Sequence, residues 1–402
     1  MLYKRKISDE VVKYLNKEQI VVLHGARQVG KTSIMLLLND YLIGQNDNTF
    51  IVDFEDKRMR EIANSGGDKF TTYLKSEGKL KDKSDKKLFL FLDEIQLLDD
   101  PSNFMKLIYD HHKEIKMIVS GSSTFEIKSK FSDSLVGRTF EFEVFPLSFE
   151  EFLVFKNKPF KLNGTNRFID QELKELYGEY AMFGGYPAVV LETNKEIKEK
   201  MLVQIVETYA KKDIRDLANV QEVNKFNKLL EALATQCGNM LNVRELSNTC
   251  DLSATTVEKY LFILEQTYII KLVKPWSTNK RSELFKTPKI FFFDSGLANV
   301  LATNALPEKI GGHDFENSVW EELVKKYGKN NIYYWRTKSR LEIDFILKQG
   351  DKLLPIEAKL NFFQFQNAPF RAFARNYGTS DHRMVALEGD RTINNGFYPW
   401  EL

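Results

Sequence analysis

Short apolar runs alternate with amphipathic segments over the N-terminal part of the chain. The runs are typical of strands, and they lie at residues 20–24, 50–54, 88–92, 117–119 and 140–144. Each of the first four is followed by a loop and an amphipathic stretch, which is the order of elements in a mainly parallel sheet covered by helices on both faces. We therefore predict an α/β domain over residues 1–148.

After Pro146 the pattern becomes helical. The segment 149–225 indicates a helical lid or linker with a turn at 184–187, because two glycines and a proline interrupt the helical periodicity there. Residues 226–300 predict three helices followed by β-rich segments. This order resembles a winged helix, but it is also the order of a generic three-helix unit.

The C-terminal segment, residues 301–402, changes pattern again and predicts a small α+β domain. Helices are expected at 315–327 and near 364–377, and strands are expected around 332–335, 341–347, 353–359 and 384–387. A domain of this size is long enough to bury a core of its own.

Residues 25–32, GARQVGKT, match the spacing G-x-x-x-x-G-K-[ST] of a phosphate-binding loop. The motif lies between a predicted strand and an apolar helix, where backbone N–H groups and the positive end of the helix dipole can face a phosphate. Its lysine neutralises phosphate oxygens, and its last hydroxyl reaches Mg²⁺. The residues expected to bind ATP and Mg²⁺, the predicted cofactors, are Gly25, Arg27, Gly30, Lys31, Thr32 and Ser33.

The apolar run 88–92 ends in two carboxylates, Asp93 and Glu94. A buried strand that ends in acids, in a chain with a phosphate loop, predicts hydrolytic chemistry. In that chemistry Asp93 shares Mg²⁺ with Thr32, and Glu94 polarises the attacking water while Lys31 holds the phosphates. The alternative is that the two acids only cap the next helix.

Polar side chains also end the next predicted strand. Ser120 and Ser122 are expected to contact the γ-phosphate or the water, with helix capping as an equal alternative. Arg138, just before the fifth predicted strand, is a candidate arginine finger or charge sensor in catalysis, although a surface role fits it equally well.

Longer phrases extend this picture beyond the phosphate site. GRTFEFEVFPLSFEEF includes the candidate arginine, and GGYP and KIFFFDSGLANVL occur farther along. With the phosphate loop and LFLFLDE, they make the chain resemble a family of archaeal and bacterial AAA-type ATPases over nearly its whole length. The resemblance implies that the strand carrying Asp93 lies beside the phosphate-loop strand, and that Arg138 or Arg215 acts as an arginine finger. It also implies a C-terminal domain of uncharacterised function with a restriction-endonuclease-like fold.

Charged and apolar residues alternate in two predicted C-terminal strands. In LEIDFIL the alternation places Glu342 and Asp344 on one face, and in PIEAK it places Glu357 and Lys359 on one face. This order resembles the D-x(n)-E-x-K arrangement of the PD-(D/E)XK nuclease superfamily. The resemblance implies that Asp344 and Glu357 coordinate Mg²⁺ and that Lys359 positions the water or the phosphate, with Glu316 on the preceding helix as the accessory metal ligand.

A structural alternative exists for the same residues. Lys359 would then form a cross-strand salt bridge with Asp344 or Glu357 on a solvated sheet face. If the site is a nuclease, the nearby basic residues Arg336, Lys338 and Arg340 would contact nucleic-acid phosphates.

The charge distribution decides where DNA, the expected macromolecular partner, would bind. The chain has 58 Lys and Arg against 56 Asp and Glu, a formal net charge of +2, so only local basic surface can attract a polyanion. The basic segment 271–289, with Trp276 to stack on a base, is one candidate, and a solvated hairpin is its alternative. The preceding helix, 253–265, carries acids and is not expected to read bases.

Composition sets the remaining limits. At 43% hydrophobic and 28% charged residues the chain is an ordinary globular protein, and its two cysteines are too few for a disulfide framework. No apolar run is long enough to span a membrane, and the start MLYKRKISDE lacks the apolar core of a secretory signal. We therefore expect a cytoplasmic protein without membrane contact.

Together these patterns predict an ATP-hydrolysing enzyme that couples its nucleotide state to a DNA-facing, nuclease-like C-terminal domain. The alternative is a nucleotide-dependent switch or scaffold whose C-terminal domain binds protein or DNA without cleaving it. An arginine finger that acts in trans would require a homo-oligomer, which the sequence leaves open.

Overall fold

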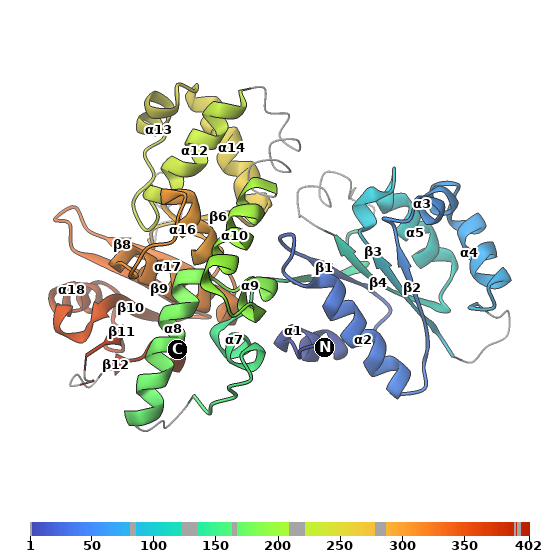
Figure 1. Cartoon of the computed structure of the whole chain (residues 1–402), viewed down its shortest axis with the longest axis horizontal. Coiled ribbons are helices and arrows are strands. Elements are labelled where there is room, and N and C mark those ends of the chain that lie inside the picture. The colour runs from blue at the N-terminus through green and yellow to red at the C-terminus, as the bar shows by residue number, and fades with distance from the viewer. Residues whose placement is uncertain are drawn as a thin grey trace. The chain divides into compact units, whose positions relative to one another are not determined.

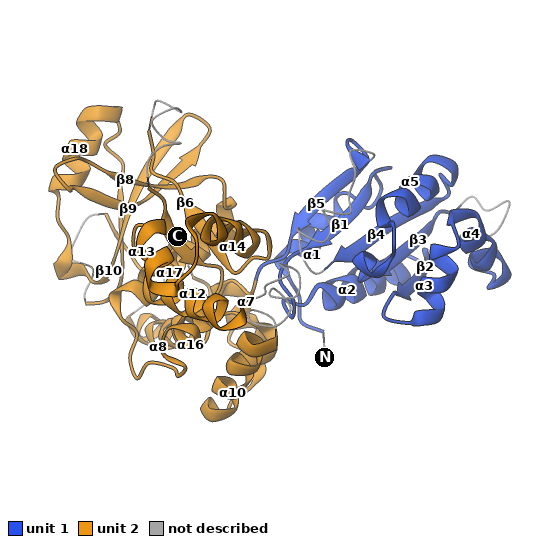
Figure 2. Cartoon of the chain, turned by 90° about the horizontal axis from the view of Figure 1, so that it is seen from above, with its two compact units in different colours: residues 1–145 blue, residues 146–402 orange. Residues whose placement is uncertain are grey.

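The computed structural model describes residues 2–80, 86–121, 135–162, 167–208, 222–277, 287–389, 391 and 395–402. The chain divides into two compact units, residues 1–145 and residues 146–402, which are blue and orange in Figure 2. Within the described ranges, no helix is both long enough and apolar enough to cross a membrane.

A five-stranded parallel sheet forms the centre of the first unit. Its strands are β1 (Ile20–His24), β2 (Asn48–Asp53), β3 (Leu88–Asp93), β4 (Ile115–Gly121) and β5 (Thr139–Glu143). The five predicted strands are therefore confirmed. β1, β3 and β4 are buried along their whole length. This burial is expected for the central strands of a parallel sheet that is covered on both faces.

The strand order, β2-β3-β4-β1-β5, corrects one expectation. β4 lies between β1 and β3, because its residue Ile118 pairs with Val21 of β1 and its residue Val119 pairs with Leu92 of β3. The expectation that the strand carrying Asp93 lies directly beside the phosphate-loop strand is therefore wrong. The fully buried β4 takes the central place, and Asp93 can approach the loop only at the carboxyl edge of the sheet.

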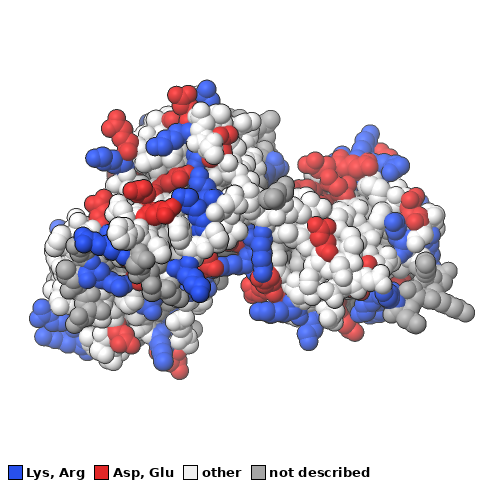
Figure 3. Space-filling view, turned by 60° about the horizontal axis from the view of Figure 1, so that its bottom comes forward, with Lys and Arg blue, Asp and Glu red and all other residues white. Residues whose placement is uncertain are grey.

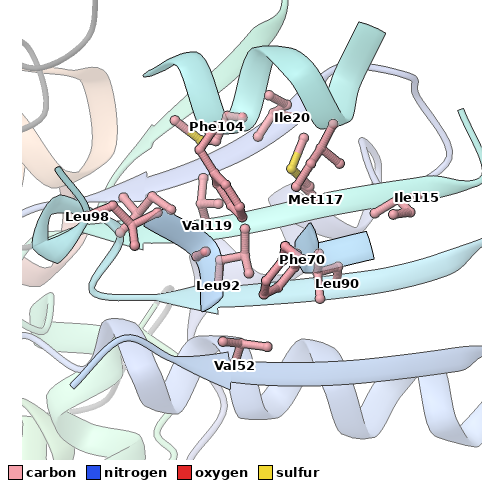
Figure 4. Close-up of a cluster of buried hydrophobic side chains, with 14 of the residues drawn as sticks. Ile20, Val52, Phe70, Leu90, Leu92, Leu98, Phe104, Ile115, Met117 and Val119 are labelled. Carbon is pink, nitrogen blue, oxygen red and sulfur yellow. The ribbon is translucent and has the colours of Figure 1, made fainter. Parts of the chain in front are cut away.

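Helices cover this sheet. α2 (Lys31–Gly44) contacts β2 and β4, and α1 (Lys6–Val12) contacts α2. A buried apolar cluster lies between the strands and four further elements: α3 (Lys57–Asn64), α4 (Gly67–Ser76), the short η1 (Ile95–Leu97) and α5 (Pro101–His111). Figure 4 shows Phe70 and Phe104 of this cluster close to Leu92, and the two rings meet edge to face at 5.1 Å.

The second unit begins with a largely helical part (Figure 1). Its elements are α7 (Phe149–Phe155), α8 (Arg167–Phe183), α9 (Pro187–Leu191), α10 (Lys195–Ile205), α12 (Val223–Thr235), α13 (Val243–Cys250), α14 (Ala254–Gln266), β6 (Ile270–Val273), β7 (Lys289–Phe292) and α16 (Ser295–Thr303). The three helices predicted after residue 226 correspond to α12, α13 and α14. They are followed by β6 and β7, which pair antiparallel.

Three of the longer sequence phrases meet at one buried junction in this part. The Leu147 N–H donates to Gly185 O, and the Gly185 N–H donates to Asp294 Oδ2, both at 2.7 Å. Gly184 has a φ of 75°, and a Cβ atom there would lie 2.1 Å from Asp294 Oδ1. PLSFEEF, GGYP and DSGL therefore build a packing junction, and the glycines permit the close approach.

A second, mixed sheet follows α17 (Gly312–Tyr327). β8 (Ile332–Arg336), β9 (Glu342–Gln349) and β10 (Lys352–Asn361) are antiparallel neighbours, whereas β11 (Arg383–Glu388) and β12 (Gly396–Phe397) join in parallel, in the order β12-β11-β10-β9-β8. The other elements are η4 (Phe362–Gln364), α18 (Ala368–Tyr377) and η5 (Pro399–Glu401). The predicted helices and strands are confirmed, and β12 was missed because two residues are too few to show a periodicity.

Candidate functional site

The phosphate loop joins the carboxyl end of β1 to the first turn of α2. Gly25 packs against the chain after β5, where a Cβ atom would lie 2.1 Å from the Val144 carbonyl oxygen. Gly30 is the N-cap residue of α2, and its φ of 93° and ψ of 29° are a left-handed conformation that glycine adopts without steric cost. One motif glycine therefore permits a close backbone approach, and the other permits the turn into the helix.

Lys31 is buried within the loop. Its Nζ donates to the carbonyl oxygens of Gly25, at 3.1 Å, and Ala26, at 2.7 Å. Arg27 in the loop and Ser33 in the first turn of α2 are exposed. The predicted loop residues thus combine a buried ammonium group with side chains that face solvent.

Arg5 holds the same loop and was not predicted from the sequence. Its guanidinium donates to Val29 O at 2.8 Å through Nη1 and to Phe145 O at 3.0 Å through Nη2. The side chain is buried, although it comes from a basic segment ahead of α1. A single arginine among several basic residues gives no sequence signal for such a contact.

Three side chains from different elements meet beside the loop. The Thr32 hydroxyl donates to Asp93 Oδ2 at 2.6 Å, and the Ser120 hydroxyl donates to Asp93 Oδ1. Asp93 ends β3, and Ser120 lies near the end of β4. A hydroxyl in contact with a buried carboxylate is a set of hard oxygen ligands of the kind that Mg²⁺ prefers, so these residues fit the expected metal. Ser122 lies outside the described residues.

Glu94 follows Asp93 in a left-handed conformation, with a φ of 51°. Its N–H donates to Asp93 Oδ1 at 3.1 Å, and its carboxylate accepts a hydrogen bond from the Gln96 side chain. Burial raises the pKa of Glu94, and the charge of Lys31 acts against this rise. A half-buried carboxylate with a raised pKa beside a phosphate loop is suited to accept a proton from water.

The structure does not bring Arg138 to this site. Its guanidinium donates to Asp110 Oδ1 at 3.1 Å and lies over the ring of Tyr109. Its carbonyl accepts the N–H of Ile20 at the amino end of β1, whereas the phosphate loop leaves the opposite end, roughly 15 Å away along the strand. The expectation that Arg138 serves the site of its own chain therefore does not hold. The other candidate, Arg215, lies outside the described residues.

A second group of charged side chains lies on β9 and β10. Lys359 Nζ is 2.8 Å from Asp344 Oδ2 and 2.8 Å from Glu357 Oε1. Asp344 Oδ2 also accepts the backbone N–H of Ala358 at 3.0 Å. The structure thus brings together the aspartate, glutamate and lysine that strand alternation places on shared faces.

Glu316 and Lys289 complete this group, which we call the acid-lysine cluster (Lys289, Glu316, Glu342, Asp344, Glu357 and Lys359). Lys289 Nζ lies 3.1 Å from Glu316 Oε1 and 2.7 Å from Glu342 Oε1. Burial raises the pKa of Glu316 and of Glu357, and the charge of Asp344 adds to both shifts.

The two interpretations of the basic segment 271–289 were a DNA-contacting segment and a solvated hairpin, and neither describes Lys289. The residue is buried and bonded to carboxylates, so its charge is not available to a polyanion. Its position at the start of an apolar strand is the one sequence signal that could have indicated burial.

Trp276 is also held within the protein. Its ring meets that of Tyr333 edge to face at 5.2 Å, and Lys348 Nζ lies 5.6 Å from its centroid. A base could therefore stack on Trp276 only by displacing Tyr333 or Lys348 from its ring. Residues 278–286 of the same basic segment lie outside the described residues.

The basic residues before β9 divide into two kinds. Arg336 Nη1 lies 3.2 Å from Glu342 Oε2, whereas Lys338 and Arg340 are exposed. On the face seen in Figure 3, Lys and Arg side chains are interspersed with Asp and Glu. The exposed Lys338 and Arg340 are thus the predicted phosphate contacts in this segment that the structure leaves at the surface.

Three family models match the chain. Residues 17–153 match one described as an AAA domain. Residues 174–308 match a domain of unknown function (DUF8612), and residues 311–399 match another domain of unknown function (DUF4143). The C-terminal match carries no known function, so the restriction-endonuclease-like fold stays a prediction.

Similar proteins include uncharacterised ones from distant organisms. A protein of Haemophilus influenzae is 25% identical over 367 residues, which cover 89% of this chain and 86% of that protein. A protein of Methanocaldococcus jannaschii is 26% identical over 353 residues, which cover 85% of this chain and 75% of that protein. Among solved structures, the Walker-type ATPase of Pyrococcus abyssi aligns with a TM-score of 0.48 at 14% identity, over 75% of this chain and 96% of that one.

The N-terminal match and the site agree with each other. The AAA-domain match spans the phosphate loop, Asp93 and Ser120. The structure places the hydroxyl of Thr32 and that of Ser120 on the Asp93 carboxylate. The match and this geometry support an AAA-type P-loop ATPase domain in the N-terminal unit.

Proposed function

We propose that the chain binds and hydrolyses ATP with Mg²⁺ at the phosphate loop. The observation that carries the proposal is the 2.6 Å contact of the Thr32 hydroxyl with the Asp93 carboxylate, beside the buried Lys31. Thr32 and Asp93 would hold the metal, which when bound neutralises phosphate oxygens.

The chain's own side chains would do the remaining work. Lys31, whose ammonium donates to loop carbonyls, would donate to phosphate oxygens of ATP. Ser120 would keep Asp93 oriented through its hydrogen bond. Glu94 would accept a proton from the attacking water, and its raised pKa makes it a stronger base than an exposed glutamate.

A Glu94→Gln substitution tests this assignment. The variant should bind ATP as the parent does and hydrolyse it about a hundredfold more slowly, because the amide cannot accept the proton. Glu77→Gln is the matched control, since Glu77 is an exposed glutamate of the same unit. Parental turnover in Glu94→Gln would contradict the role of Glu94, and failure of the parent to bind ATP would contradict the whole proposal.

We further propose that the nucleotide state governs a DNA-facing C-terminal domain. The exposed Lys338 and Arg340, close in sequence to the acid-lysine cluster, support a contact with phosphates. A cleaving domain needs carboxylates open to a metal, and a binding-only domain does not. The bonds of Lys289 to Glu316 and Glu342 favour binding without cleavage.

Linear, single-stranded and branched DNA distinguish these two outcomes. Each would be incubated with the parent and with Asp344→Asn, in Mg²⁺ or Mn²⁺, with and without ATP. ATP-dependent retention of DNA without products supports the binding-only domain. Cleavage products that are lost in Asp344→Asn would support cleavage instead. If the protein neither retains DNA nor produces cleavage products, a role with DNA is contradicted.

A further inference from the structure

The acid-lysine cluster contains a second lysine that the nuclease-like order of residues does not include. Lys289 comes from β7, outside the sheet that carries Asp344 and Glu357. Its Nζ lies 2.7 Å from Glu342 Oε1, 3.1 Å from Glu316 Oε1 and 4.0 Å from Asp344 Oδ1. A single buried ammonium group therefore faces three carboxylates from α17 and β9.

The carboxylate oxygens of the cluster are largely committed to these donors. Asp344 presents Oδ1 to Lys289, while its Oδ2 accepts from Lys359 and from the backbone N–H of Ala358. Glu357 lies against Lys359 through Oε1, and its Oε2 accepts the Asp344 N–H at 3.4 Å. With both ammonium groups in place, no group of three His, Cys, Asp or Glu side chains in the described part of the chain is arranged to hold a metal.

Contacts between β7 and α17 hold the Lys289 ammonium group in position. Asn317, one residue after Glu316, accepts the Phe292 N–H at 2.8 Å and donates to Phe292 O at 3.1 Å. Phe291 stacks on Trp320 of α17 at 5.3 Å. The strand that carries Lys289 and the helix that carries Glu316 are thus joined by both hydrogen bonds and ring packing.

Charge explains why a lysine is tolerated at this depth. The Lys289 side chain is 4% exposed, and burying an ammonium group alone would carry a large desolvation penalty. The same holds for the carboxylates around it, so each group needs the other. A divalent cation would have to displace the ammonium group to reach Glu316 and Asp344 together.

We propose that Lys289 takes the place of the divalent cation in the acid-lysine cluster, so that the C-terminal domain binds no catalytic metal and cleaves no phosphodiester. The residues of the cluster do not fit Mg²⁺ as they stand. The inference rests on the proposed nuclease-like order of Asp344, Glu357 and Lys359, and it is independent of ATP hydrolysis. The cluster then joins β7 to α17 and β9 through buried charge.

Mn²⁺ titration calorimetry on nucleotide-free, full-length protein tests this proposal. Every protein would carry Asp93→Asn, so that the phosphate site contributes no metal contact. The parent and Lys289→Arg, which keeps a cation, should show no saturable binding. Lys289→Met, which keeps the length but removes the charge, should show saturable binding of one Mn²⁺, about tenfold or more tighter than the upper limit on affinity that the titration sets for the parent. Adding Asp344→Asn should abolish that gain.

Two results would overturn the proposal. One is saturable Mn²⁺ binding by the parent that Asp344→Asn removes, a measurement that needs no change at Lys289. The other is a Lys289→Met protein with a cooperative thermal transition that binds Mn²⁺ no better than the parent. Because neither readout involves ATP or DNA, failure here is distinguishable from failure of the proposed ATPase.

Discussion

Asp93 in the N-terminal unit and Asp344 in the C-terminal unit are both buried carboxylates, yet their partners differ. Asp93 accepts hydrogen bonds from the hydroxyls of Thr32 and Ser120. Asp344 faces the ammonium group of Lys359 at 2.8 Å and that of Lys289 at 4.0 Å. Neutral donors orient a carboxylate and leave its charge to be balanced by a cation, whereas ammonium groups already balance it. Under the proposed function, similar acids would therefore hold a metal in one unit and form a closed ion-pair network in the other.

The largest effect on ATP binding is expected from Lys31→Ala. Removing the loop ammonium takes away the charge that would face the phosphates, so the affinity for a non-hydrolysable ATP analogue should fall about a hundredfold or more, which is about 3 kcal/mol. Calorimetric titration measures this, with Lys69→Ala as the control because Lys69 is exposed in the same unit. Unchanged affinity in Lys31→Ala would refute the phosphate site.

Lys289→Ala should reduce the free energy of unfolding by about 3–5 kcal/mol, because it leaves buried carboxylates without their partner. Lys225→Ala is the matched control in the same unit. Lys225 pairs with Glu222 and with the largely exposed Asp251, where solvent screens the charges, so its loss should change the free energy of unfolding far less. Urea denaturation measures both values, and equal losses would remove the contrast between the buried cluster and an exposed pair.

Gly25→Ala should cost about 1–3 kcal/mol and weaken ATP binding, because its Cβ would meet the Val144 carbonyl at 2.1 Å and force the loop to shift. Gly44→Ala, in the α2 helix that the loop precedes, has nothing within 4 Å of its Cβ and should be neutral or slightly stabilising. Thermal denaturation compares the two. A Gly25→Ala protein as stable as the parent would show that the close approach is not required.

The smallest effect concerns pH. The raised pKa of Glu94 means that the native state holds its proton to higher pH than the unfolded state does, so this group's contribution to stability declines as pH rises from the ordinary glutamate value through the raised one. ATP turnover changes in the opposite direction over the same window, because only the carboxylate accepts a proton. A pH profile of turnover whose acidic limb coincides with that of an exposed glutamate would contradict this role.

Much of the phosphate site was predictable because its parts are local in sequence. The loop occupies 25–32, and Asp93 and Ser120 each end an apolar strand. Parallel strands present their carboxyl ends at one edge, so side chains at those ends converge whichever strand is central. This is why the site could be predicted although β4, rather than β3, is the neighbour of β1.

The remaining contacts depend on packing between distant segments. Arg5 reaches Val29 and Phe145 across the unit, and Lys289 reaches Glu316 only because β7 packs on α17. Neither lysine nor arginine carries a periodicity that separates a buried ion pair from an exposed one. In the C-terminal domain, strand alternation predicted that Asp344, Glu357 and Lys359 would meet, but it could not predict which cation would join them.

Counting Mn²⁺ ions by electron paramagnetic resonance, in the presence of a saturating non-hydrolysable ATP analogue, compares the two carboxylate sites in one experiment. The account predicts one bound Mn²⁺ per chain, lost in Asp93→Asn and retained in Asp344→Asn. Two bound ions per chain, or one that disappears in Asp344→Asn and persists in Asp93→Asn, would contradict it.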